Sequence, residues 1–173
     1  MKYLLSILLV LSGAMTMVCS AQTAEVDSRL PVIFQLGEFE VQMDNESLTH
    51  KTQLLTACDY DIELAYGKWI SMVKEMEAYS NSIGYDINGV KVWLNIFFES
   101  NGQIGHIGYY LKPNSKNLDR QEFAAFLKSF VNNYSFPHTF NEPFSHYGSA
   151  GFPTSAYEVP SQTPDTSSAG RGN

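Results

Sequence analysis

GVKVWLNIFFE-SNG-QIGHIGYYL, residues 89–111, is the sequence that decides the fold of this chain. Its first part alternates between two faces, as a half-buried β-strand does. Asn101-Gly102, between two strand-like runs, predicts a β-hairpin with a type I′ turn, in which both central residues have positive φ. We therefore expect Gly102 to have positive φ. The apolar face of the first strand comprises Val90, Val92, Leu94, Ile96 and Phe98, and the other face Lys91, Trp93, Asn95 and Phe97.

The residues that follow predict a helix in LDRQEFAAFLKSFVNNY, residues 118–134. Asp119 and Glu122 have the spacing of a capping box, which marks a helix start. Pro137 prevents continuation past Phe136, so the helix should end around Asn133. The apolar residues have helical spacing and fall on one side: Phe123, Phe126, Leu127, Phe130 and Val131.

A second helix is predicted to begin near Asp59 and to end at Asn81–Gly84. One stripe runs along it with spacings of four and three residues, which is typical of a helix that packs on a sheet. A ligand pocket lined by this stripe is the alternative interpretation. The stripe comprises Ile62, Tyr66, Trp69, Val73 and Met76.

Outside these elements the sequence predicts shorter strands. Residues 31–36 and 37–43 have strand-like patterns, and residues 44–47 predict a turn. His50 lies in the polar run that follows and is expected to be solvated. Residues 145–152 predict a last short strand or an extended segment that covers the sheet.

Together these elements predict an α+β fold in which a small antiparallel sheet packs against two helices around a strand–strand–helix core unit. The expected organisation is a signal peptide (1–21), a flexible lead (22–30), one domain (31–153) and a disordered tail rich in Ser, Thr, Pro and Gly (154–173).

The N-terminus has the pattern of an export signal. Lys2 precedes an apolar run, Leu4–Val18, that is short for a transmembrane span, and Cys19-Ser20-Ala21 places small residues before a cleavage site at Gln22. We expect an exported protein, periplasmic or extracellular, with no transmembrane span in the mature chain. Acylation of Cys19 as a lipoprotein is the alternative, which Val18 disfavours because a small residue is usual there.

Charge and cysteine content narrow the function classes. The 173-residue chain has a formal net charge of −7, which gives it no electrostatic reason to bind nucleic acid or anionic lipid. Cleavage would leave Cys58 as the only cysteine, so no internal disulfide could form. We expect this thiol to be buried, and a redox or nucleophilic role is the alternative.

No catalytic signature is present, and we expect no cofactor. His106, His138, Glu142 and His146 are residue types that could bind zinc, but their spacing specifies no metal site. The alternative function is a small metal-dependent or hydrolytic enzyme that uses the three histidines.

The order helix, strand, strand, helix, strand over residues 59–152 resembles the C-terminal domain of TonB-type energy transducers and their periplasmic relatives. The resemblance rests on VKVWLNIFF, the Asn101-Gly102 turn with Gln103-Ile104, Ser115 before Leu118-Asp119, and Phe136-Pro137. It implies a periplasmic interaction module. A TonB transducer also has a long Pro-rich spacer before this domain, which is missing here, so energy transduction is not implied.

We therefore expect a non-catalytic binding domain whose partner is a protein or an extended peptide of the cell envelope. The free edge of the sheet would accept the peptide, because unpaired backbone groups there can bind another strand. The expected edge is the segment Ser145–Phe152. The candidate contact residues are Tyr109, Tyr110, Phe144, Tyr147 and Ser149.

Overall fold

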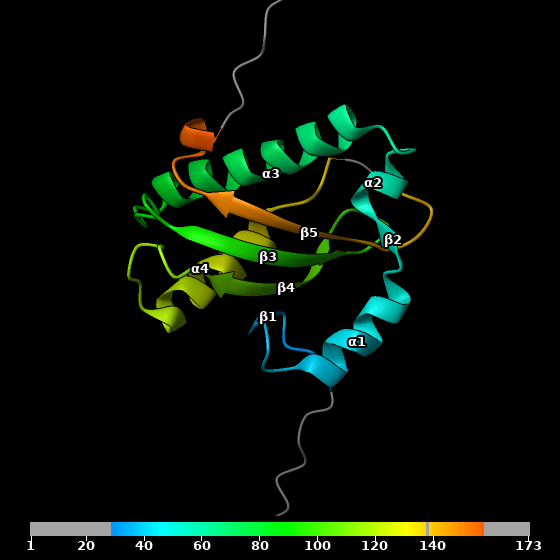
Figure 1. Cartoon of the computed structure of the whole chain (residues 1–173), viewed down its shortest axis with the longest axis horizontal. Coiled ribbons are helices and arrows are strands. Elements are labelled where there is room, and N and C mark those ends of the chain that lie inside the picture. Colours follow the sequence, from blue (N-terminus) through cyan, green and yellow to red (C-terminus); the bar gives the residue numbers. More distant parts are fainter. Residues whose placement is uncertain (1–28, 138, 158–173) are drawn as a thin grey trace, which may run out of the picture.

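The computed structural model describes residues 29–137 and 139–157. Within them a five-stranded sheet packs against helices (Figure 1). In chain order the elements are β1 (Ile33–Gln35), α1 (Glu40–Thr49), β2 (Thr52–Gln53), α2 (Leu54–Ala57), α3 (Ile62–Ser82), β3 (Lys91–Phe98), β4 (Ile104–Leu111), α4 (Arg120–Asn133), β5 (Phe144–Gly151) and the 3₁₀-helix η1 (Thr154–Tyr157).

The strands lie in the order β1-β4-β3-β5-β2. The central strand β3 is antiparallel to both β4 and β5, as predicted. The short outer strands β1 and β2 pair in parallel with β4 and β5, so the sheet as a whole is mixed. The predicted α+β class is confirmed. Helices α3 and α4 correspond to the two predicted helices, and α1 and α2 are additional.

Helices α3 and α4 cover one face of the sheet, which we call the covered face (Figure 1). Asp119 caps α4 by accepting hydrogen bonds from the amides of Gln121 and Glu122, and Asp61 caps α3 in the same way through Leu64. The five apolar residues predicted for one face of β3 are each at most 1% exposed beneath these helices. Burial of this apolar stripe stabilises the core.

The hairpin turn differs in type from the prediction. Gly102 has φ +85°, so its predicted positive φ is confirmed, but Asn101 does not share it. Gly102 N donates to Glu99 O at 2.9 Å, and Glu99 N donates to Gln103 O at 2.8 Å. These bonds close a three-residue loop, in which one left-handed glycine after a tight turn matches the twist of the strands. The type I′ assignment is therefore wrong.

The predicted strand at residues 37–43 and turn at residues 44–47 are also wrong, because this region forms helix α1. Phe39 and Met43 are four residues apart, so in a helix they lie on the same side, where both contact the apolar cluster of Leu30, Phe34 and Phe97. Val41, which alternation assigned to the core, is 72% exposed. Of three apolar residues in alternation, the first and third are four residues apart and therefore also share a helix face.

His50 is buried, with 2% of its surface exposed, and the expectation of a solvated side chain is wrong. Its ring lies 5.4 Å from that of Phe97, between α1 and the sheet.

The described domain extends slightly beyond the predicted limits of residues 31 and 153. Leu30 is buried, and Thr154–Tyr157 forms η1, whose Thr154 amide donates to Glu77 at 3.0 Å. The predicted signal peptide and the remainder of the tail lie outside the described residues.

Candidate functional site

The candidate site lies on the face of the sheet opposite α3 and α4, which we call the open face. Helix α1 covers one part of this face, where Phe97 packs with Leu30 and Phe34. The rest of the face carries three aromatic side chains that we call the aromatic platform. Trp93 is 37% exposed, Tyr110 is 50% exposed and Tyr147 is 54% exposed.

Strand register brings the platform together from three strands. Trp93 of β3 lies directly opposite Tyr110 of β4 and Ser149 of β5. Tyr147 lies two residues from Ser149 on the same face, and its ring is parallel to that of Trp93, with 3° between the planes and 5.4 Å between the centroids. Because residues i and i+2 of a strand share a face, the register alone makes these rings neighbours.

A cation lies against the platform. Lys112 Nζ is 4.2 Å from the centroid of a Trp93 ring and donates a hydrogen bond to Ser149 Oγ. A cation over a tryptophan face is attracted by the electrons of the ring. The platform therefore combines flat apolar surface with an ammonium and a hydroxyl at its border, which suits a ligand that has both apolar side chains and polar groups.

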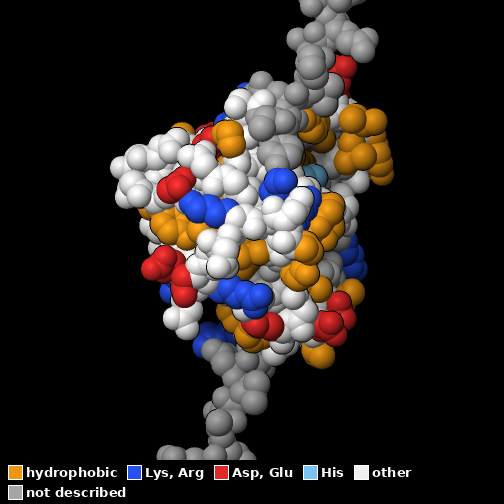
Figure 2. All heavy atoms as spheres, turned by 60° about the vertical axis from the view of Figure 1, so that its left-hand side comes forward, with side chains coloured by type: hydrophobic (Ala, Val, Ile, Leu, Met, Phe, Trp, Pro, Cys, Tyr) orange, Lys and Arg blue, Asp and Glu red, His pale blue; other side chains and the backbone are white. Residues whose placement is uncertain are grey.

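Other hydrophobic side chains are exposed too, in patches separated by charged side chains (Figure 2). Tyr60 and Ile62, before and at the start of α3, are each 71% exposed. Exposure alone therefore does not distinguish the platform from other exposed patches. The platform is distinguished by its position beside an open edge of the sheet.

That edge belongs to β5. Strand β2 pairs only with Phe144 and Ser145, and no other described strand lies on that side of the remaining residues. Phe152 N donates to Val90 O at 2.9 Å, so residue 152 bonds toward β3. Hydrogen-bonded pairs alternate along an antiparallel ladder, so the backbone groups of Tyr147 and Ser149 point away from β3, toward the free edge.

Three of the five predicted contact residues meet at this site: Tyr110, Tyr147 and Ser149. Tyr109 and Phe144 do not, and their assignment to a contact surface is corrected here. They lie on the covered face, 3% and 0% exposed, and the Tyr109 hydroxyl donates to Arg120 O at 3.2 Å. Burial, followed by the charge of Glu38, raises the pKa of Tyr109, which keeps this hydroxyl protonated.

Trp93 and Lys112 were missed as site residues. A signal for Trp93 was present, because alternation along β3 places it on the face opposite the apolar stripe. Trp93 lies between the polar residues Lys91 and Asn95 on this face, which marks it as a candidate contact residue, whereas Phe97 at the end of the same face is buried. No sequence signal relates Lys112 to Trp93, because their contact depends on the pairing of β3 with β4.

His106 and His146 do not converge on one site. His106 is paired with Phe97 and His146 with Ile96, so the two rings extend from opposite faces of the sheet. His146 lies 4.5 Å from the Trp69 ring, and burial lowers its pKa from 6.5 to about 4. Glu142 accepts a hydrogen bond from Thr52, and His138 lies outside the described residues. Among the residues that are described, no group of three or more His, Cys, Asp or Glu side chains could hold a metal ion.

Cys58 is a buried thiol, 3% exposed, in the core beneath α2 and α3. Burial is the main cause that raises its pKa, with Asp61 and Asp59 adding to the effect and Lys68 opposing it. The thiolate is the reactive form of cysteine, so a raised pKa in an apolar environment makes this side chain unreactive.

Comparison of the chain with family models, with curated proteins and with solved structures gave no match. Within residues 29–137 and 139–157, none of the helices has the length and apolar character needed to cross a membrane.

Proposed function

We propose that this chain is an exported binding domain, without catalytic activity of its own, that holds an extended segment of a partner protein beside β5. One observation carries the proposal. Tyr147 and Ser149 belong both to the free edge of β5, through their backbone groups, and to the aromatic face beside it, through their side chains.

The geometry suits addition of a strand. A neighbouring strand lies about 4.8 Å away and exchanges backbone hydrogen bonds with every second residue, here Tyr147 and Ser149. Alternate side chains of the added strand would extend from the open face next to the Tyr147 ring, with Trp93 one strand further in. Backbone bonds would supply affinity and the platform would supply selectivity for apolar or aromatic side chains.

The proposed location rests on other observations. Residues 1–21 have the pattern of an export signal, and the sequence of residues 59–152 resembles the C-terminal domain of TonB-type transducers in its expected order of helices and strands. We propose a partner in the cell envelope on these grounds. The net charge of −7 argues against nucleic acid as the ligand.

Proline substitution at the free edge tests the proposal. Tyr147→Pro and Ser149→Pro each remove an N–H that points away from β3, so they should abolish capture of the partner from an envelope extract by the tagged chain. Ser149→Ala separates the backbone from the side chain, because it retains the edge N–H and loses only the hydroxyl, so it should capture more of the partner than Ser149→Pro does. Trp93→Ala should weaken capture about tenfold, the usual scale of an aromatic contact residue.

Circular dichroism and thermal melting of each variant check that the domain remains folded. If both proline variants are folded and capture the same partner as wild type, the partner does not bind at this edge. If the proline variants lose the partner and Trp93→Ala does not, the edge is used but the aromatic platform is not part of the site.

A further inference from the structure

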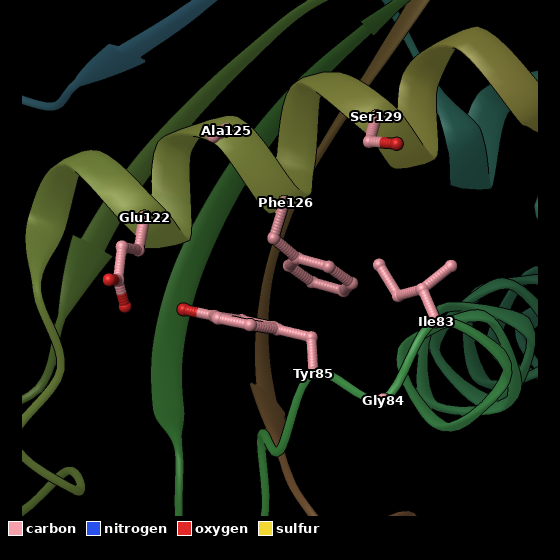
Figure 3. A pocket seen from close by; sticks show the side chains of 7 residues that line it. All are labelled: Ile83, Gly84, Tyr85, Glu122, Ala125, Phe126 and Ser129. Carbon is pink, nitrogen blue, oxygen red and sulfur yellow. The ribbon is translucent and has the colours of Figure 1, made fainter.

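A cavity that opens to the surface lies between the end of α3 and the exposed side of α4, in a different part of the molecule from the aromatic platform (Figure 3). Its volume is about 450 Å³, within the range of roughly 300–1,000 Å³ that small-molecule sites occupy. Apolar lining comes from Ile83, Tyr85, Ala125 and Phe126, and polar lining from Glu122 and Ser129.

The chain path after α3 creates this cavity. Helix α3 ends at Ser82, Ile83 remains 49% exposed, and Gly84, with φ +71°, turns the chain so that it passes beneath α4. The Tyr85 ring then stacks on Phe126 of α4, with 5.0 Å between the centroids and 23° between the planes. Figure 3 shows the Tyr85 ring along the floor, with its hydroxyl on the side of Glu122.

The Tyr85 hydroxyl is the unusual group in this cavity. Its oxygen is buried, and it has no hydrogen-bond partner among the described residues. A buried hydroxyl without a partner is unfavourable, because it has lost hydration and gained nothing in exchange. A ligand with a hydrogen-bonding group at this position would satisfy it.

The charges near this hydroxyl favour a cation. Burial is the first cause that raises the pKa of Tyr85, and the charged groups that add to the effect are both carboxylates, Glu122 and Asp119. The nearby ammonium of Lys116 is paired with Asp86 at 2.6 Å. An anion would be repelled here, whereas an ammonium could donate both to the Tyr85 hydroxyl and to the Glu122 carboxylate.

We propose that this cavity binds a small organic ammonium ion with an apolar, ring-sized body. The ammonium lies between Tyr85 Oη and Glu122, which requires a small side-chain shift because the Tyr85 oxygen is buried in the free protein. The body packs against Ile83 and Ala125 at the rim of the Tyr85 ring. The site lies between α3 and α4, on the other side of the sheet from the platform, so it is independent of strand addition at β5.

Two compounds of the same shape test the assignment. The whole chain is labelled with ¹⁵N and titrated at pH 7 with 2-phenylethylamine, a cation, and with 2-phenylethanol, which is neutral. The amine should shift the amides of residues 83–85 and 121–126 and should bind about tenfold more tightly than the alcohol, the combined scale of a partly exposed ion pair and a hydrogen bond from a charged donor. Nα-acetyl-lysine methylamide, which presents an ammonium on a peptide backbone, is titrated in the same way for comparison with 2-phenylethylamine.

Single substitutions locate the contacts. Glu122→Gln should reduce amine affinity about fivefold and leave alcohol affinity unchanged, and Tyr85→Phe should reduce it about threefold. Asp44→Asn removes the same charge from the exposed surface of α1 and should change neither affinity. A thermal melt accompanies each variant, and Glu122, which is exposed, can be replaced without unfolding the domain.

The proposal is overturned if neither compound shifts these amides, if the alcohol binds as tightly as the amine, or if Glu122→Gln leaves the preference for the amine intact. Tighter binding of the lysine derivative than of 2-phenylethylamine would overturn the small-ligand assignment in favour of a lysine side chain of a peptide. None of these outcomes bears on capture of a partner at the β5 edge.

Discussion

The two faces of the sheet differ sharply, although the same strands supply both. On the covered face Val92, Leu94 and Ile96 are completely buried beneath α3 and α4. On the open face Trp93, one residue from both Val92 and Leu94, is 37% exposed. Successive side chains of β3 thus serve two purposes, because one face supplies the apolar burial that stabilises the fold and the other can present a contact surface at little cost in stability.

The largest expected effect compares Phe98 with Trp93. Phe98 is 1% exposed and its ring lies 4.6 Å from that of Phe144 and 5.1 Å from that of Phe136. Phe98→Ala should lower the free energy of unfolding by about 3–5 kcal/mol, because it removes a large side chain and leaves a cavity. Trp93→Ala should cost only about 1 kcal/mol, the scale of an exposed aromatic pair.

Urea denaturation of both variants measures this difference, and m-values equal to that of wild type show that the comparison is valid. Equal losses of stability in the two variants would mean that the open face contributes to the core as much as the covered face does.

The next effect concerns the two histidines that lie on opposite faces. The pKa of His146 on the covered face falls from 6.5 to about 4 through burial. Between these values the unfolded chain binds more protons than the folded chain, so the free energy of unfolding should fall as pH is lowered from 6.5 to 4, by at most about 3 kcal/mol from this group. Above pH 6.5 the group contributes no pH dependence.

Carboxylates also titrate near pH 4, so the test is the difference between wild type and His146→Gln in denaturation series from pH 7 to pH 4. The variant should show a shallower loss of stability, and His106→Gln, on the open face, is the matched control. If the two variants have the same pH profile, burial of His146 does not account for the loss.

The smallest effect concerns the loop between β3 and β4, which sets the register of these strands and therefore which side chains lie on the covered face and which on the open face. Gly102 has φ +85° between β3 and β4, and a β-branched residue is strained there. Gly102→Val should lower the free energy of unfolding by roughly 1–3 kcal/mol. Gly67→Val, in α3 where a Cβ would meet nothing within 4 Å, should change it by less than about 0.5 kcal/mol.

Urea midpoints of both glycine variants give the comparison. A Gly102→Val midpoint equal to that of Gly67→Val would show that the loop accepts another conformation without loss of strand register.

Local patterns predicted the elements with long, unambiguous periods. The alternation from Val90 to Phe98 identified β3 and its buried face, and the spacing from Phe123 to Phe130 with Asp119 as cap identified α4. The region of residues 37–43 failed because three alternating apolar residues do not distinguish a strand from a helix. The helix in this region packs on the cluster of Leu30, Phe34 and Phe97. Phe97 is distant in sequence from the other two residues, so no local pattern could reveal the cluster.

By itself the sequence determined the α+β class, the two main helices and the placement of Tyr110, Tyr147 and Ser149 in strands. Tertiary structure alone decided which aromatic residues are exposed, because that depends on where α1, α3 and α4 cover the sheet. Tyr109 and Tyr110 are adjacent in sequence, yet one is 3% exposed and the other 50%. The physical reason is that a strand turns alternate side chains to opposite faces, while the helices that cover each face are placed by contacts distant in sequence.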